Sequence, residues 1–198
     1  MNAIRKARSS GFTLIEALVA VSVLLVLVSL AVPGMRTWMQ NAQIRNAAES
    51  IQDGLQRARS EAVLQNTNVE FVLGGTDDIA CLPASCSSWM VKFAGVGGAQ
   101  IASQTNVGSA EVKRTTVLSA TAPASKTTVT FNNVGNRVIN ADGSNPFASV
   151  TFDSSALSAG VGRKLTIVIG VKNAAGNYVG GTVRMCDPTF PSSDPRGC

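Results

Sequence analysis

Residues 12–32 read FTLIEALVAVSVLLVLVSLAV, a run of 21 residues in which Glu16 is the only charged side chain. At about 1.5 Å per residue, a helix of this length spans roughly 30 Å, the thickness of the hydrocarbon core of a bilayer. The residues before it include Arg5, Lys6 and Arg8 and no acidic residue. Because basic flanks stay in the cytoplasm, this pattern predicts one span, with the amino end inside and everything after it outside.

The composition excludes several classes of protein. Of the 198 residues, 45% are hydrophobic and 15% are charged, too few hydrophobic residues for a chain with several spans. There is no histidine, which excludes His general acid–base catalysis, Ser–His–Asp and Cys–His nucleophiles and His-ligated metals. Neither a Ser-x-x-Lys pattern nor a phosphate-binding glycine loop is present. We therefore expect no enzymatic activity, no cofactor and no metal.

A secretory signal peptide has the same order of basic and apolar regions. Here, however, the apolar run is longer than a normal signal-peptide core, and Pro33-Gly34-Met35 follows it in place of a small-residue cleavage site. Glu16 is also unexpected in a simple signal or anchor, because a carboxylate within hydrocarbon costs about 2.5–3.5 kcal/mol on insertion scales. Such a group needs a partner.

The hexapeptide Gly11-Phe12-Thr13-Leu14-Ile15-Glu16, with the basic leader before it and the apolar run after it, resembles the processing motif of type IV pilins and type II secretion pseudopilins. In that superfamily a membrane peptidase cuts after the glycine and methylates the new amino terminus. The resemblance implies cleavage between Gly11 and Phe12, so that Phe12 becomes the first, N-methylated residue. It also implies that Glu16 acts in assembly, where it pairs with the Phe12 amine of an adjacent subunit.

Residues 34–64 continue the helical pattern, but with one apolar stripe in place of an apolar surface all round. The stripe consists of Ile44, Ala48, Ile51, Leu55, Ala58 and Ala62. Pro33 is expected to kink or loosen the helix where it leaves the membrane, and Gly54 to weaken it without ending it. The segment LQRARSEAV at 55–63 resembles the helix end of H-type pseudopilins and of minor pilins of the FimT/FimU kind.

Residues 65–198 are predicted to form an extracytoplasmic, β-rich globular domain. Short β-rich runs are separated by glycine turns, with no helical pattern between them. The runs are 69–73, 89–93, 111–118, 127–131, 149–152, 165–171 and 178–185. We expect residues 95–110 to be an exposed loop. The predicted fold class is α+β and pilin-like: a long amino-terminal transmembrane helix packed against an antiparallel β-sheet domain.

The four cysteines are Cys81, Cys86, Cys186 and Cys198. An even number in a domain outside the cytoplasm indicates two disulfides, for which three connectivities are possible. The most economical pairing is local, Cys81–Cys86 with Cys186–Cys198. A zinc site made of all four thiolates is the alternative, but it fits neither the spacing nor an oxidising compartment.

Nucleic acid is a further possible partner. Residues 181–184, Gly-Thr-Val-Arg, are similar to the Gly-Arg-x-Arg strand of DNA-binding minor pilins, with Arg184 in the second arginine position and Thr182 in place of the first. The basic pairs at 113–114 and 163–164 offer additional charge, although isolated basic pairs on strand edges usually serve solubility.

The sequence thus predicts a structural subunit of a type IV pilus-like filament: a minor pilin or pseudopilin with no catalytic role. Its implied partners are other pilin-type subunits, the prepilin peptidase and the assembly platform of the bacterial inner membrane. Three functions remain open: type IV pilus assembly, the H-type pseudopilin role in type II secretion, and DNA uptake. The formal charge of +5 is weak support for the last, because the three basic residues of the leader are predicted to be removed.

Overall fold

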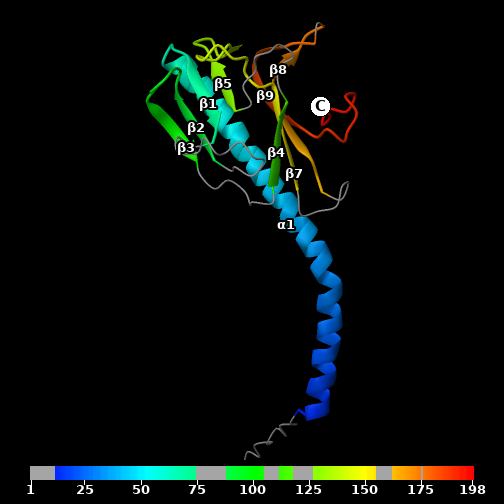
Figure 1. Cartoon of the computed structure of the whole chain (residues 1–198). Coiled ribbons are helices and arrows are strands. Elements are labelled where there is room, and N and C mark those ends of the chain that lie inside the picture. Colours follow the sequence, from blue (N-terminus) through cyan, green and yellow to red (C-terminus); the bar gives the residue numbers. More distant parts are fainter. Residues whose placement is uncertain (1–11, 75–87, 105–111, 118–126, 155–161, 175) are drawn as a thin grey trace, which may run out of the picture. The chain divides into compact units, whose positions relative to one another are not determined.

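A computed structural model describes residues 12–74, 88–104, 112–117, 127–154, 162–174 and 176–198 (Figure 1). The chain divides into two compact units, Met1–Trp38 and Met39–Cys198. The predicted α+β fold, with a long amino-terminal helix and antiparallel sheets, is confirmed.

Helix α1 extends over Leu14–Leu64. Its first turn is capped by Thr13, whose Oγ1 accepts a hydrogen bond of 3.3 Å from the backbone N–H of Glu16. The large hydrophobic side chains from Leu14 to Leu30 are all exposed, between 49% at Val28 and 80% at Leu14. This part of α1 is apolar all round, the pattern of a helix that is covered by lipid or by other helices.

No single helix among the described residues has both the length and the apolar character needed to cross a membrane. Two segments of α1, Leu14–Leu30 and Gly34–Leu64, meet that requirement only when they are taken together. The helix is bent by 41° at the break between them. The break contains Pro33, which has no backbone N–H to donate to the helix.

The second unit contains two antiparallel sheets. In one, the strand order is β3-β2-β1-β5-β6, and in the other it is β4-β7-β8-β9. The strands are β1 Val69–Leu73, β2 Trp89–Phe93, β3 Gln100–Gln104, β4 Val112–Val117, β5 Thr128–Phe131, β6 Arg137–Val138, β7 Ser149–Ser154, β8 Leu165–Lys172 and β9 Tyr178–Cys186. Every pairing between neighbouring strands is antiparallel.

Two strands differ from expectation. Residues 95–110, predicted to be an exposed loop, contain the edge strand β3, and this part of the prediction is wrong. Its sequence, QIASQ, is mostly polar and exposed, and only Ile101 and Ala102 are packed partly against the core, so pairing with β2 rather than hydrophobic pattern makes it a strand. Strand β6 has two residues, too few for any periodicity to show.

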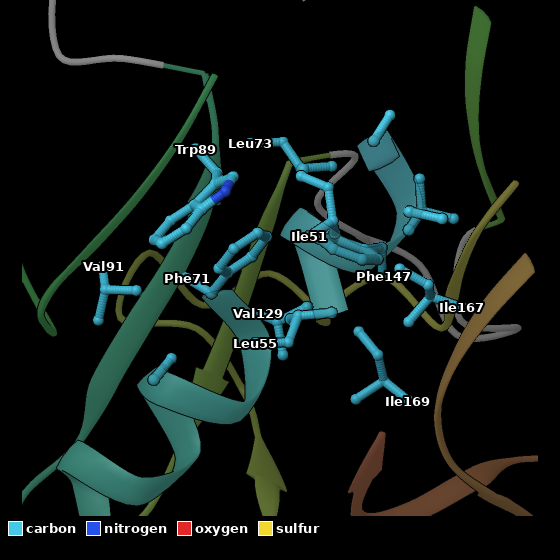
Figure 2. Packing of buried hydrophobic residues seen from close by; sticks show 14 of the residues in the cluster. Ile51, Leu55, Phe71, Leu73, Trp89, Val91, Val129, Phe147, Ile167 and Ile169 are labelled. Atoms are coloured by element: carbon cyan, nitrogen blue, oxygen red, sulfur yellow. The ribbon is translucent and has the colours of Figure 1, made fainter. Parts of the chain in front are cut away.

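The core of the second unit lies between α1 and the two sheets. The six side chains of the predicted apolar stripe on α1 are at most 1% exposed, which confirms that prediction. Figure 2 shows Ile51 and Leu55 of α1 beside Phe71 and Val129 of one sheet and Ile169 of the other. Helix α1 is therefore the element on which both sheets bury their apolar faces.

Gly54 lies where the aromatic rings of the core approach α1. A Cβ atom at this position would lie 2.7 Å from Cε2 of Phe71 and 2.9 Å from Cδ2 of Trp89. The centroids of the two rings are 5.9 Å apart. The Trp89 indole N–H also donates a hydrogen bond of 3.0 Å to Oγ of Ser50 on α1. The predicted cost of glycine in a helix therefore has a reason: the missing side chain makes room for the Phe71–Trp89 pair.

Arg137 of β6 connects the two sheets. Its guanidinium donates one hydrogen bond to the backbone oxygen of Phe147, at 3.1 Å, and another to that of Tyr178, at 2.6 Å. Burial lowers the pKa of Arg137 from its ordinary value. Next to this contact, Gly181 of β9 lies so close to the backbone oxygen of Gly135 that a Cβ atom there would overlap it. The sheets thus meet at β6 and β9.

We predict that Gly54→Ala lowers the free energy of unfolding by about 1–3 kcal/mol, because the new methyl group overpacks the rings of Phe71 and Trp89. The matched control is Gly34→Ala, where nothing lies within 4 Å of the added Cβ. There the better helix propensity of alanine, up to about 1 kcal/mol, should leave stability equal or higher. Thermal unfolding of the full chain in detergent, followed by circular dichroism, checks both; the same change in both variants contradicts the prediction.

Candidate functional site

The residues of the predicted processing and assembly site lie at the start of α1. Gly11, the residue before the expected cleavage point, lies outside the described residues. Phe12 is 77% exposed, and Glu16 is exposed in the first turn of the helix, four residues later. A carboxylate in the first turn interacts favourably with the positive end of the helix dipole.

Glu16 has no ion-pair partner among the described residues. It is followed directly by the apolar, exposed segment that ends at Leu30. A charged group at the end of such a surface is expensive to bury unless a counter-charge reaches it. Among the described residues, the first part of α1 thus presents an exposed carboxylate followed by exposed apolar side chains. Cleavage after Gly11, methylation of Phe12 and the pairing of Glu16 remain predictions.

The carboxy-terminal tail is closed by a disulfide. Cys186, the last residue of β9, is bonded to Cys198, with 5.2 Å between the two Cα atoms, as predicted. Cys81 and Cys86, the other predicted pair, lie outside the described residues. The bond returns the tail to the end of β9, where Asp187 and Gly197 form a parallel bridge.

Asp187 holds the start of this tail. Its side chain is 6% exposed; one carboxylate oxygen accepts a hydrogen bond of 3.0 Å from the backbone N–H of Thr189, and the other accepts one of 3.3 Å from Nε of Arg163. Burial raises the pKa of Asp187, but the bonds from Thr189 and Arg163 outweigh it, so that the pKa lies below its ordinary value. The backbone N–H of Asp187 also donates to the oxygen of Arg196 at 2.7 Å.

The predicted basic residues do not form one surface of free charges. Arg163 is paired with Asp187, and Lys164 with Asp153 at 3.0 Å. Lys113 and Arg114 are on β4, whose backbone pairs with β7 at the edge of the four-stranded sheet. Arg184, the possible DNA contact, is exposed on β9 and donates a hydrogen bond of 3.3 Å to the backbone oxygen of Cys198.

Arg184 lines a groove that the sequence did not reveal. The groove has a volume of about 580 Å³, and its lining also includes Lys172 of β8 and Tyr178 of β9, which are directly paired. Alternation along β8 would have placed Lys172 on the same face as Thr166 and Val168. The groove itself depends on the tail. The predicted pairing of Cys186 with Cys198 closes this tail but does not indicate its path over the sheet.

Within the described parts of the chain, no three His, Cys, Asp or Glu side chains come together as metal ligands do. Carboxylates there, such as Glu70 and Asp187, are engaged by Lys92 at 3.3 Å and by Arg163 at 3.3 Å. These contacts stabilise the fold, and none of them brings together a nucleophile and a base.

Comparison with known families agrees with this arrangement. Residues 6–32 match the prokaryotic N-terminal methylation motif. Together with the long helix and the antiparallel sheets, this motif defines a minor pilin or pseudopilin, a class of structural subunits. Residues 47–196 match the family of type II transport protein GspH, and because that match covers most of the chain, the protein belongs to the GspH family.

Several solved structures are similar to the chain. The type IV minor pilin FimU of Pseudomonas aeruginosa has 18% sequence identity and a TM-score of 0.46, with 81% of this chain and 98% of that chain covered. A second crystal form of FimU has 20% identity and a TM-score of 0.40, with 78% and 98% covered. The minor pseudopilin EpsH of the type 2 secretion system of Vibrio cholerae has 13% identity and a TM-score of 0.46, with 75% and 99% covered. No curated protein matches the chain.

Asp187→Asn should lower the free energy of unfolding by about 1–3 kcal/mol at pH 7, because the charge-assisted bonds to Thr189 and Arg163 are weakened. Since the pKa of Asp187 is lowered in the folded state, this stability is present above about pH 4, the ordinary carboxyl pKa, and is lost as pH falls through the lower folded value. The difference in the free energy of unfolding between the wild type and the variant should therefore shrink towards pH 2.

Thermal unfolding of both chains between pH 7 and pH 2 checks this. Asp53→Asn, at an exposed position on α1, is the control and should leave the unfolding midpoint unchanged at pH 7. The difference in unfolding midpoint between the wild type and Asp187→Asn could instead stay constant over the whole pH range. That result would show that the carboxylate charge of Asp187 plays no part in stability.

Proposed function

We propose that the chain is a minor pilin that a prepilin peptidase cleaves between Gly11 and Phe12 and that then joins a type IV pilus. The observation that carries this proposal is the first part of α1. There Glu16, which has no ion-pair partner among the described residues, precedes an exposed apolar surface up to Leu30. The match of residues 6–32 to the N-terminal methylation motif supports it. Before assembly this segment would anchor the chain in the inner membrane, with residues 65–198 in the periplasm.

In this proposal, assembly is a change of surroundings for the apolar part of α1. Lipid and neighbouring helices cover leucine and valine about equally well, so hydrophobic burial alone does not favour the filament over the bilayer. A polar contact must therefore favour the filament over the bilayer. The Glu16 carboxylate of one subunit and the Phe12 amine of the next have opposite charges, and each lowers the cost of burying the other.

The carboxy-terminal disulfide supports a location outside the cytoplasm. Disulfides persist in oxidising compartments such as the bacterial periplasm and are rare in the cytosol. The bond between Cys186 and Cys198 closes a tail that contains three prolines. The tail and its proline content favour a surface-exposed subunit of a pilus, where a carboxy-terminal end closed by a disulfide would resist unfolding.

The second candidate is the H-type pseudopilin of a type II secretion system. The observation that favours it is the match of residues 47–196 to type II transport protein GspH. The same helix and the same Glu16 contact would then serve a short periplasmic pseudopilus that moves folded proteins outward.

Assembly is tested by Glu16→Ala in cells that make the filament. We expect the variant to be inserted and cleaved as well as the wild type, because the cleavage point precedes it, but its amount in sheared filaments should fall about tenfold or more with loss of the ion pair. The matched control is Glu49→Ala, which removes an exposed carboxylate paired with Arg45 at 2.7 Å on the same helix. Equal incorporation of Glu16→Ala and wild type would refute the role of Glu16.

A deletion strain separates the two candidate systems. Loss of surface pili and of twitching, with normal levels of secreted enzymes, is the result expected for a minor pilin. Loss of enzyme secretion with intact pili would instead assign the chain to type II secretion. Natural transformation measured in the same strain tests DNA uptake.

A further inference from the structure

The groove that contains Arg184 lies over strands β7, β8 and β9 of the four-stranded sheet. Along β8, Ile167 and Ile169 point into the core, so the alternate residues Thr166 and Val168 point to the opposite face. Thr166 and Val168 line the groove. Pro188 of the disulfide-closed tail also lines it, which makes a wall on a sheet face that would otherwise be open.

The lining of this groove combines hydroxyl groups with positive charges. Three threonines, one serine and one tyrosine contribute hydroxyls: Thr151, Thr166, Thr182, Ser149 and Tyr178. Lys172 and Arg184 contribute the charges, and no Asp or Glu side chain lines the groove. Arg184 is opposite Val168 in the register, and Lys172 lies four residues further along β8, beyond a bulge between Ile169 and Val171.

The two cations differ in the contacts that they already make. In the part of the chain that the structure describes, neither Lys172 nor Arg184 forms an ion pair with a carboxylate side chain, whereas the nearby Lys164 is paired with Asp153 at 3.0 Å. The Arg184 guanidinium has one hydrogen bond, 3.3 Å long, to the backbone oxygen of Cys198. An arginine has five N–H donors, so the Arg184 guanidinium still has donors that can bind a planar acceptor such as a carboxylate.

We propose that this groove binds an acidic oligosaccharide, a chain of sugars that carries carboxylate groups. The volume of about 580 Å³ is within the usual range of ligand sites, about 300–1,000 Å³. Carboxylates of the saccharide would meet Arg184 and Lys172, and its hydroxyls would exchange hydrogen bonds with the hydroxyls of Thr182 and Tyr178, each of which both donates and accepts. The hydroxyls of Thr151 and Thr166 are bonded to each other at 2.8 Å.

The same features favour a saccharide over nucleic acid. Tight binding to DNA comes from about six to ten phosphate contacts, and a duplex carries a charge about every 1.7 Å. The two cations of the groove match few of those charges. Hydroxyl groups outnumber cations in the lining, and they suit a ligand that is itself rich in hydroxyls and carries only occasional charges.

The test uses the full chain in a neutral detergent and is independent of filament assembly, so its result is separate from that for the proposed function. Binding of tetragalacturonate is measured by calorimetry beside neutral maltotetraose and a single-stranded thymidine oligonucleotide. We expect saturable binding of tetragalacturonate that is about tenfold or more weaker in Lys172→Gln and in Arg184→Gln, the usual effect of losing a hydrogen bond to a charged group.

Lys164→Gln is the matched control, because its positive charge is already paired, and it should bind as the wild type does. Lys172→Gln leaves the contact between Arg184 and the tail in place, so weaker binding in that variant cannot be assigned to a displaced tail. Three results would each overturn the proposal: no binding of tetragalacturonate, equal binding of maltotetraose, or binding of the oligonucleotide alone.

Discussion

The uncovered apolar surface at the start of α1 is the constraint on which the rest depends. Leucine and valine side chains between Leu14 and Leu30 are about half exposed or more, and burying the remaining exposed area of each would stabilise the helix by roughly 1–2 kcal/mol. No described residue of the same chain covers them. In the proposed function, lipid or neighbouring helices supply that cover.

The same helix meets a different requirement in the second unit. From Ile44 to Ala62 it has one apolar stripe, which both sheets cover, and its other faces carry polar side chains. Gly54 lets the rings of Phe71 and Trp89 approach the backbone, and Arg137 joins the two sheets at their meeting edge. The domain is thus built on the second part of a helix whose first part is apolar and exposed.

Some of this structure follows from local sequence pattern. The stripe on α1 and strands such as β1 and β2 were predicted correctly because hydrophobic periodicity is strong there. Strand β3 was missed because pairing with β2 holds it, and no periodic pattern marks it. The contacts of Arg137 and the groove beside Arg184 join residues that are distant in sequence, and only the folded chain brings these together.

The most direct test of the central claim is to analyse the amino terminus of the chain in purified filaments. Sheared filaments and inner membranes from the native organism would be separated, and the chain from each would be analysed by mass spectrometry of its first peptide. If α1 is a filament segment, the chain in the filaments begins at a methylated Phe12. A chain that keeps residues 1–11 and is found in the membrane alone would contradict this.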